Sequence, residues 1–331
     1  MKTIIIAEAG INHNGKIQIA KKLIQAAANS GADYIKFQTY KTENMITPKA
    51  RLANYQRRNL NNSISQYSML KKYELKKHSY KILKRHAHKK KIKFLSSPFD
   101  NESLSLLSKL NLDFIKVPSG EIDNYPFLKE LGKLKKKVIL STGMSNLSEI
   151  SNAISILCRY GTKRKDISIL HCHTEYPSSP DNLNLNAIIT LKNKFKLRVG
   201  LSDHSNNINA GSLAVALGAK IIEKHITLNK RMAGPDHRAS ANPNEFKEMV
   251  KLIRLTEKML GNGKKIPTHI EVKNKIFARK SLVAKRDIKK GEKFSESNLT
   301  TKRPGFGISP TKFNYYLKKK AKKKYLKDDL I

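Results

Sequence analysis

The sequence of 331 residues is poor in cysteine, in acidic residues and in long apolar runs. Its two cysteines, Cys158 and Cys172, cannot build a disulfide framework, which favours a reducing compartment. No run of about 18 apolar residues occurs, so we expect no transmembrane helix. The apolar run near the N-terminus stops at Glu8 and does not fit a secretory signal peptide. Together these absences predict a cytoplasmic protein without a membrane-bound segment.

Acidic residues number 26 against 66 lysines and arginines, which gives a formal net charge of +40. A field of this size attracts polyanions such as nucleic acids. However, the lysines are spread along the chain, and their local runs lack the interleaved aromatic residues that bind single-stranded nucleic acid. We therefore interpret most of the charge as solvated surface and predict no specific nucleic-acid site. A non-enzymatic basic protein that binds nucleic acid is the alternative of a different class.

The sequence does contain a regular alternation of two hydrophobic patterns. Eight short apolar runs each end in polar residues, at 3–9, 34–39, 93–97, 114–118, 138–142, 167–173, 198–202 and 220–225. The stretches between them space their apolar residues by about 3.6 positions, which is typical of amphipathic helices. Eight buried parallel strands that alternate with helices predict an α/β fold, the (β/α)8 or TIM barrel. A doubly wound sheet is the alternative, but residues 10–15 lack its G-x-G-x-x-G turn.

The alternation stops after Gly261-Asn262-Gly263, which has the composition of a linker. The remaining residues have the pattern of short β segments and turns. We predict a barrel over 1–262, a linker over 263–276 and a small domain over 277–331. A module this small needs a neighbouring surface to be stable.

Polar residues follow nearly all of the predicted strands, where the active sites of barrels collect. Hydroxyl groups and lysines among them favour a phosphate or phosphate-ester pocket. His204 and His225 end the seventh and eighth strands, which are neighbours in a barrel, so their imidazoles can meet on one divalent metal ion. The candidates are Glu8, Lys36, Gln38, Ser96, Ser97, Lys116, Ser119, Glu121, Ser141, Thr142, His171, His173, Tyr176, Ser202, Asp203, His204, Glu223, Lys224 and His225.

These strand ends form a recognisable set of motifs. They read AEAGINHNG at 7–15, KFQT at 36–39, SSPF at 96–99, KVPSGE at 116–121, LSTGM at 140–144, HCHTEYP at 171–177, GLSDH at 200–204, EKH at 223–225 and GPDH at 234–237. The set resembles that of the bacterial sialic acid synthases, which condense phosphoenolpyruvate with an N-acylated hexosamine to give nine-carbon 2-keto acids. The tail, with TKRPG at 301–305, resembles the antifreeze-like SAF domain of that family, a β-clip fold.

The resemblance implies roles for individual residues. It implies that a divalent ion, Mn²⁺ first and Mg²⁺ or Co²⁺ as alternatives, is held by His204 and His225. The implied phosphoenolpyruvate ligands are Lys36, Ser97, Lys116, Ser119, Ser141 and Ser202. The implied sugar ligands are Glu8, Gln38, Tyr176, Glu223 and Asp236. The implied catalytic groups are Lys116, which offsets phosphate charge, and Glu8 and Asp236, the two candidates for deprotonating the attacking water.

The resemblance also implies a domain-swapped homodimer. In the family, the SAF domain of one subunit caps the barrel of the other. Arg303 would then reach the N-acyl group of the sugar, with Phe277 beside it. One departure is Lys318, since relatives usually place glycine after the leucine that corresponds to Leu317.

The resemblance leaves the sugar open. Our first interpretation is N-acetylmannosamine, which gives N-acetylneuraminate. The alternative is 2,4-diacetamido-2,4,6-trideoxymannose, which gives N,N'-diacetyllegionaminate, and a deoxy-octulosonate-type synthase is a more distant one. The two sugars differ at C4 and C6, so we expect the deciding contacts in the loops after Thr39 and Tyr176, including residues 51–66.

Overall fold

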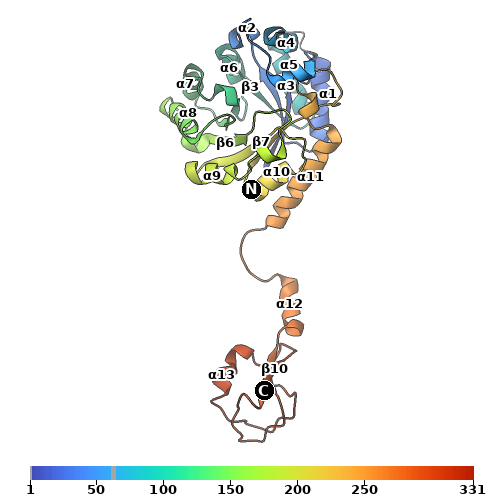
Figure 1. Ribbon diagram of the computed structural model, residues 1–331, viewed down its shortest axis with the longest axis vertical. Helices are drawn as coiled ribbons and strands as arrows, with labels where there is room; N and C mark the ends of the chain where they lie inside the picture. Colours follow the sequence, from blue (N-terminus) through green and yellow to red (C-terminus); the bar gives the residue numbers. More distant parts are fainter. Residues whose placement is uncertain (1, 61–64) are drawn as a thin grey trace. The chain divides into compact units, whose positions relative to one another are not determined.

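The computed structural model describes residues 2–60 and 65–331. The chain divides into two compact units, Met1–Gly261 and Asn262–Ile331, drawn in Figure 1. The division lies next to the boundary predicted at residue 262.

The first unit is built on eight parallel strands. They are β1 (Ile4–Gly10), β2 (Tyr34–Thr39), β3 (Lys93–Pro98), β4 (Ile115–Val117), β5 (Val138–Ser141), β6 (Ile167–Cys172), β7 (Arg198–Asp203) and β8 (Ile221–His225). They pair in the order β3-β2-β1-β8-β7-β6-β5-β4, and the two outer strands, β3 and β4, pack against each other. The sheet therefore curves into a barrel, which confirms the predicted fold.

Helices surround the strands (Figure 1). They are α1 (Ile17–Asn29), α2 (Thr42–Met45), α3 (Asn54–Leu60), α4 (Gln66–Tyr73), α5 (Lys77–Lys89), α6 (Asn101–Ser108), α7 (Tyr125–Lys133), α8 (Leu147–Arg159), α9 (Ala187–Phe195), α10 (Ala210–Ala216) and α11 (Pro243–Leu260). Side-chain caps start several of them: Asp100 accepts from the Ser103 amide, and Asn146 forms a capping box with Glu149.

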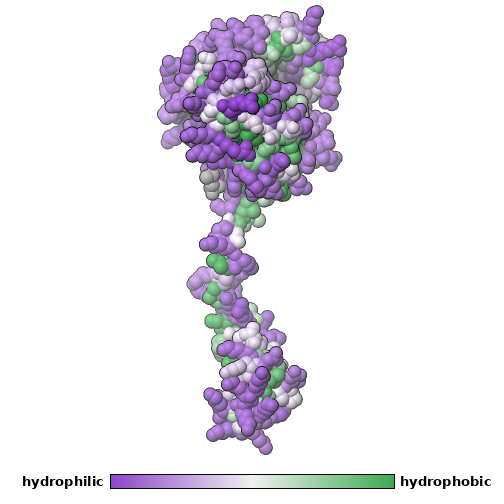
Figure 2. Space-filling view, turned by 90° about the vertical axis from the view of Figure 1, so that its left-hand side faces the viewer, coloured by the Kyte–Doolittle hydropathy of each residue, from purple (hydrophilic) through white to green (hydrophobic). Residues whose placement is uncertain are grey.

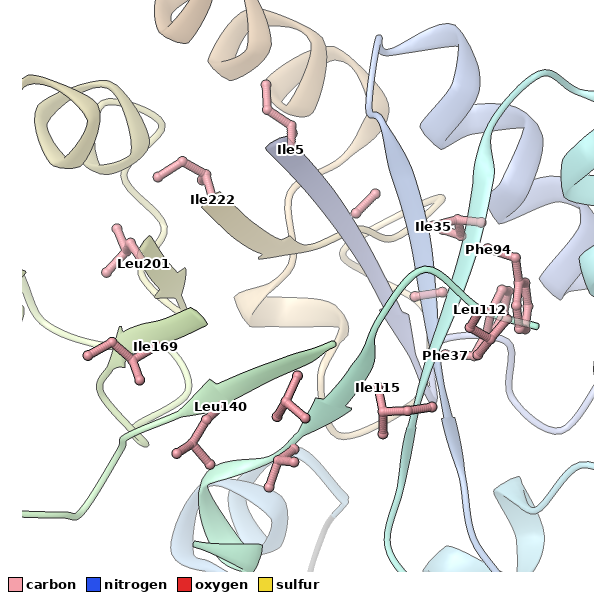
Figure 3. Packing of buried hydrophobic residues seen from close by; sticks show 14 of the residues in the cluster. Ile5, Ile35, Phe37, Phe94, Leu112, Ile115, Leu140, Ile169, Leu201 and Ile222 are labelled. Carbon is pink, nitrogen blue, oxygen red and sulfur yellow. The ribbon is translucent and has the colours of Figure 1, made fainter. Parts of the chain in front are cut away.

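The main apolar core lies between the strands and the helices. Alternate strand residues supply it, because successive side chains of a strand point to opposite faces. Figure 3 shows Ile169, Leu201 and Ile222 among the labelled members of this layer, each from a different strand. All three side chains are buried. This layer fixes the helices to the outside of the barrel and leaves the opposite face of each strand for the interior.

The second unit contains α12 (His269–Ala278), β9 (Ser281–Ala284), β10 (Leu299–Lys302) and α13 (Phe313–Tyr316). The two strands pair antiparallel. A small core of its own is formed by Ala284, Ile288, Phe294, Leu299, Ala321 and Tyr325. Leu317 packs against this core, and Lys319 donates to the Tyr316 carbonyl, so a turn forms around Lys318 without glycine.

Helix α12 occupies most of the segment predicted as a linker, 263–276. A capping box starts it, in which Thr268 Oγ1 accepts from the Glu271 amide and Glu271 accepts from the Thr268 amide. The spacing Thr-x-x-Glu is the sequence signal for such a start, and it was present in the sequence. Glycine at 261 and 263 marks only the beginning of the segment.

The surface in Figure 2 is largely hydrophilic, as expected from the number of lysines. Within residues 2–60 and 65–331, no helix is long and apolar enough to cross a membrane.

Candidate active site

A polar layer lies directly above an apolar layer inside the barrel. The apolar layer is a separate cluster of Ile6, Tyr34, Leu95, Phe114, Ile139, Leu170 and Ile221. Two residues further along each strand, the same inward face carries Glu8, Lys36, Ser97, Lys116, Ser141, Cys172 and Glu223. Strand β7 follows the same rule with Gly200 and Ser202. Gly200 has no room for a side chain, because a Cβ would lie 2.3 Å from the Ile221 carbonyl oxygen.

The polar layer lines a cavity of about 370 Å³. Every barrel residue to which the resemblance assigns a role contributes to its wall: Glu8, Lys36, Gln38, Ser97, Lys116, Ser119, Ser141, Tyr176, Ser202, His204, Glu223, His225 and Asp236. Phe277 and Arg303 belong to the second unit, where Phe277 is exposed and Arg303 Nε donates to the Ala278 carbonyl at 3.0 Å. The structure thus gathers the barrel residues into one place, and their individual roles stay predictions.

Four buried polar atoms on this cavity have neither a hydrogen-bond partner nor an ion-pair partner among the described residues. They are Glu8 Oε1, Ser141 Oγ, Glu223 Oε2 and His225 Nδ1. An unpaired buried donor or acceptor costs about 1–3 kcal/mol, so such atoms are rare in folded proteins. Their concentration on one cavity indicates that these atoms are placed for a polar ligand.

Two lysines and two glutamates meet at the floor of the cavity. Lys36 Nζ lies 2.7 Å from Glu8 Oε2 and 3.6 Å from Glu223 Oε1, and it donates to Ser97 Oγ at 3.1 Å. Lys116 Nζ lies 3.3 Å from Glu223 Oε1. All four charged side chains are buried. Such lysines are suited to bind an anionic group that reaches the floor.

The two glutamates differ in their affinity for protons. Burial raises the pKa of Glu8 to about 7, because the nearby Lys36 offsets this only in part and the charge of Glu223 adds to it. Burial acts on Glu223 as well, but Lys116 and Lys36 together hold its pKa at about 2. Glu223 is therefore a permanent anion, while Glu8 can take up and release a proton near neutral pH. Two carboxyl groups whose surroundings push their pKa values apart are typical of a site for acid–base catalysis.

Asp236 is a second buried carboxyl group on the cavity. Burial raises its pKa to about 6, and His204 offsets that only in part. It lies on the segment after β8, whereas Glu8 lies on β1. The site therefore offers two carboxyl groups, from different elements, that titrate near neutral pH.

The rings of His204 and His225 lie 5.4 Å apart, measured between centroids. His204 Nδ1 lies 2.6 Å from the His173 carbonyl oxygen, so Nδ1 carries the proton in that bond and Nε2 is the nitrogen available to an ion. Burial acts to lower the pKa of His204, but Cys172 and the His173 carbonyl outweigh it and raise the pKa, so an ion would take the place of a proton on Nε2. Burial and nearby positive charge lower the pKa of His225 well below its usual value, which keeps that ring neutral. Neutral imidazoles with a free nitrogen are metal ligands, so the pair fits a divalent ion.

The histidine pair would supply two protein ligands to such an ion. Among residues 2–60 and 65–331, no group of three or more histidine, cysteine, aspartate or glutamate side chains is arranged to hold a metal. An ion on His204 and His225 would therefore complete its coordination with water or with ligand oxygen atoms.

Gly10 lies where β1 bulges, next to both His225 and Glu8. Its φ is +51°, and a Cβ would lie 3.3 Å from His225 Cε1 and 3.4 Å from Glu8 Oε1. Only glycine adopts this conformation without cost and leaves that space free.

We expect Gly10→Ala to lower both stability and activity. The left-handed backbone costs about 1–2 kcal/mol, and the methyl group displaces His225 or Glu8. Urea unfolding and steady-state kinetics measure the two effects. Gly261→Ala is the matched control, because Gly261 has φ +59° with nothing within 4 Å, so it should lose stability and keep activity. Full activity of Gly10→Ala would contradict the crowding argument.

An aromatic stack covers the histidine pair. The ring of Tyr176 lies 4.0 Å from that of His204, and Tyr55 stacks on Tyr176 at 4.9 Å. Tyr55 belongs to α3, within the segment 51–66 that the sequence could not place. Gln56 and Gln66 of the same segment also line the cavity, whereas residues 61–64 lie outside the described part of the chain.

Sequence reasoning missed the apolar wall of the cavity and one cysteine. The wall consists of Ile11, Met45, Met69, Leu70 and Phe99. These residues belong to a satellite core built around α2 and α4. In the sequence, this satellite core could have been found from the helical spacing of Met69, Leu70 and Tyr73. Cys172 could have been found from its position two residues after the inward-facing Leu170.

Several strand-end candidates do not line the cavity. Those on the strands or directly after them alternate to the outer face, whereas Glu121 lies in a short 3-10 helix that follows β4. Ser96 bonds the Thr39 hydroxyl, and His171 Nε2 lies 2.7 Å from the Leu183 carbonyl oxygen. The other candidates outside the cavity wall are Glu121, Thr142, His173, Asp203 and Lys224.

The barrel, with buried lysines, histidines and carboxyl groups at the carboxyl ends of its strands, has the architecture of a barrel enzyme. The NeuB family model matches residues 23–265, and the SAF domain model matches residues 279–331. The chain therefore belongs to the NeuB family and is an enzyme, a synthase, which confirms the resemblance found in the sequence.

Named relatives match over nearly the whole chain. The N,N'-diacetyllegionaminic acid synthase of Campylobacter jejuni is 54% identical over 330 residues, which is 100% of this chain and 99% of the relative. That of Legionella pneumophila is 42% identical, over 95% and 89% of the two chains. The crystal structure of the N-acetylneuraminic acid (sialic acid) synthetase of Leptospira borgpetersenii has a TM-score of 0.74 at 35% identity, over 83% and 90%.

Proposed function

We propose that this chain is an N,N'-diacetyllegionaminic acid synthase. It would condense phosphoenolpyruvate with 2,4-diacetamido-2,4,6-trideoxymannose and water, and release N,N'-diacetyllegionaminate and phosphate. The observation that carries the proposal is the 54% identity, over the full chain, with the Campylobacter jejuni synthase of that name. Our first interpretation of the sequence is N-acetylmannosamine, but the relatives support the alternative sugar better.

The apolar wall of the cavity supports the same sugar. Compared with N-acetylmannosamine, this substrate carries a methyl group in place of the C6 hydroxymethyl and an acetamido group in place of the C4 hydroxyl. Both changes add apolar surface, which is stabilised by about 25 cal/mol per Å² when it leaves water. Met45, Met69 and Leu70 offer such a surface beside the polar floor.

The floor of the cavity is suited to hold phosphoenolpyruvate. Lys36 and Lys116 would offset the charge of its phosphate and carboxylate groups, and the hydroxyl groups of Ser97, Ser141 and Ser202 lie on the same wall. Lysine and hydroxyl donors around a buried anion stabilise it through charge-assisted hydrogen bonds. Ser141 Oγ has no hydrogen-bond partner among the described residues, so it is free to donate to a substrate oxygen.

In the proposed reaction, C3 of phosphoenolpyruvate attacks the aldehyde carbon of the open-chain sugar. A C–C bond forms, positive charge develops at C2, and water adds there before the C–O bond breaks and phosphate leaves. Glu8 or Asp236 would take the proton of that water, since both titrate near neutral pH. His204 and His225 would hold a divalent ion, Mn²⁺ as first candidate, which when bound supplies Lewis-acid stabilisation of charge on a substrate oxygen.

A side-by-side assay of phosphate release with the two sugars tests the proposal. We expect kcat/KM for 2,4-diacetamido-2,4,6-trideoxymannose to exceed that for N-acetylmannosamine by at least about tenfold, which corresponds to about 1.4 kcal/mol of differential transition-state binding. A preference for N-acetylmannosamine would contradict the assigned sugar and leave the synthase family intact. Turnover with neither sugar would contradict the proposed function.

We also propose that the enzyme is a homodimer in which the SAF unit takes part in sugar binding through Arg303 and Phe277. Phe277 is 72% exposed within this chain, so its ring is available to a partner surface.

Removal of residues 266–331 tests that role. We expect the truncated protein to keep phosphoenolpyruvate binding, since the lysines of the floor belong to the barrel, and to lose most of its sugar affinity. Isothermal titration calorimetry with phosphoenolpyruvate and a KM measurement for the sugar separate the two effects. Arg303→Ala in the full chain is the milder variant and should raise KM for the sugar. An unchanged KM in both proteins would exclude the role.

A further inference from the structure

A buried ion pair links β7 and β8, the two strands that lead to His204 and His225. Lys224 Nζ lies 2.5 Å from Asp203 Oδ2, and the two side chains are 1% and 0% exposed. Asp203 and Lys224 are register partners in the ladder between β7 and β8. Neither residue lines the cavity, so the pair lies on the outer face of the barrel wall.

On each strand, the residues directly before and directly after the ion pair line the cavity. One residue earlier on each strand, Ser202 Oγ donates to Glu223 Oε1 at 3.1 Å. One residue later come His204 and His225, which line the cavity again. The ion pair therefore fixes β7 against β8 at the level between the acid floor and the histidines.

The pair also holds the peptide groups that follow His204. Asp203 Oδ1 accepts from the Ser205 amide at 2.8 Å, and Lys224 Nζ donates to the Ser205 carbonyl at 2.6 Å. The backbone amide and carbonyl groups of Ser205 are thus both bound by this ion pair. Because His204 lies between Asp203 and Ser205, its backbone is restrained on both sides.

Stability alone does not account for such a pair. Moving two charges out of water is costly, and an apolar pair of similar volume is often at least as stable. An ion pair instead defines a geometry. Here it fixes the turn at residues 203–205 and the distance of that turn from β8.

We propose that Asp203 and Lys224 are positioning residues that hold His204 and His225 at the spacing needed to bind one divalent ion. The proposal rests on the metal site described above. That site draws only two ligands from the described residues, so a shift of either imidazole removes half of its protein donors. Residues that orient metal ligands typically change metal affinity by about 10- to 100-fold when they are replaced.

The test uses the full chain with its metal removed. Mn²⁺ affinity is measured by isothermal titration calorimetry, without substrates, for wild type, Asp203→Asn, Lys224→Met and the double variant. We expect each single variant to bind Mn²⁺ about 10- to 100-fold more weakly. The single variants leave a buried charge unpaired and should also lose thermal stability, whereas the double variant should regain stability and keep its low Mn²⁺ affinity.

That separation distinguishes positioning from a merely structural role. A folded double variant that binds Mn²⁺ as tightly as wild type would overturn the proposal. Asp33→Asn is the matched control, because it breaks the ion pair of Asp33 with Arg254, 2.9 Å apart at the opposite end of the strands. It should lower the melting temperature and leave Mn²⁺ affinity unchanged. Unchanged Mn²⁺ affinity in His204→Ala would instead refute the metal site itself.

Discussion

Turnover by the His204→Ala variant is expected to fall by at least about three orders of magnitude. His204 and His225 are the only two imidazoles that meet on this cavity among the described residues, and a third side-chain ligand is not arranged there. Loss of one of two ligands should release the ion. The Lewis-acid stabilisation that a bound ion supplies amounts to several kcal/mol, and each 1.4 kcal/mol is about tenfold in rate.

Phosphate release measures this effect, with and without EDTA and with Mn²⁺ added back. Wild type should lose activity in EDTA and recover it with Mn²⁺, and His204→Ala should be inactive under all three conditions. His171→Ala is the matched control, because His171 also ends a barrel strand and does not line the cavity. It should stay within a fewfold of wild type. Activity of His204→Ala that keeps the metal dependence of wild type would show that the ion binds elsewhere.

The barrel and its site were predictable because two regular patterns coincide in the sequence. Continuous apolar runs reveal buried parallel strands, and the polar residue at the end of each run marks the mouth. Because successive side chains of a strand point to opposite faces, every second residue faces the cavity. Ser97 therefore lines the cavity, whereas Ser96 faces outward. Applied to every strand, that rule would also have identified Cys172 as a cavity residue and Asp203 as an outer one.

The insertion between β2 and β3 was not predictable in the same way. Helices α2 and α3 span four and seven residues, too short for a helical period to show. They are fixed by packing of the satellite core, in which Met69 and Tyr73 contact residues distant in sequence such as Ile11. Tyr55 therefore reaches Tyr176 through tertiary structure that no local pattern encodes.

Glu8→Gln is expected to lower kcat by about 10²- to 10⁴-fold, the range for loss of a general base. Glutamine keeps the size of the side chain and cannot take a proton from water. Its amide also leaves Lys36 without the charge now 2.7 Å away, so phosphoenolpyruvate should still bind, and its affinity should rise or stay unchanged. A fall in kcat without a rise in KM for phosphoenolpyruvate would mark a catalytic role.

The pH profile decides which carboxyl group accepts the proton. Burial raises the pKa of Glu8 to about 7 and that of Asp236 to about 6, so each is protonated and inactive as a base below its own value. If Glu8 is the base, kcat/KM, which reports the free enzyme, should rise with pH through about 7, and Glu8→Gln should remove that rise while Asp236→Asn keeps it. If the rise lies near 6 and only Asp236→Asn removes it, Asp236 is the base.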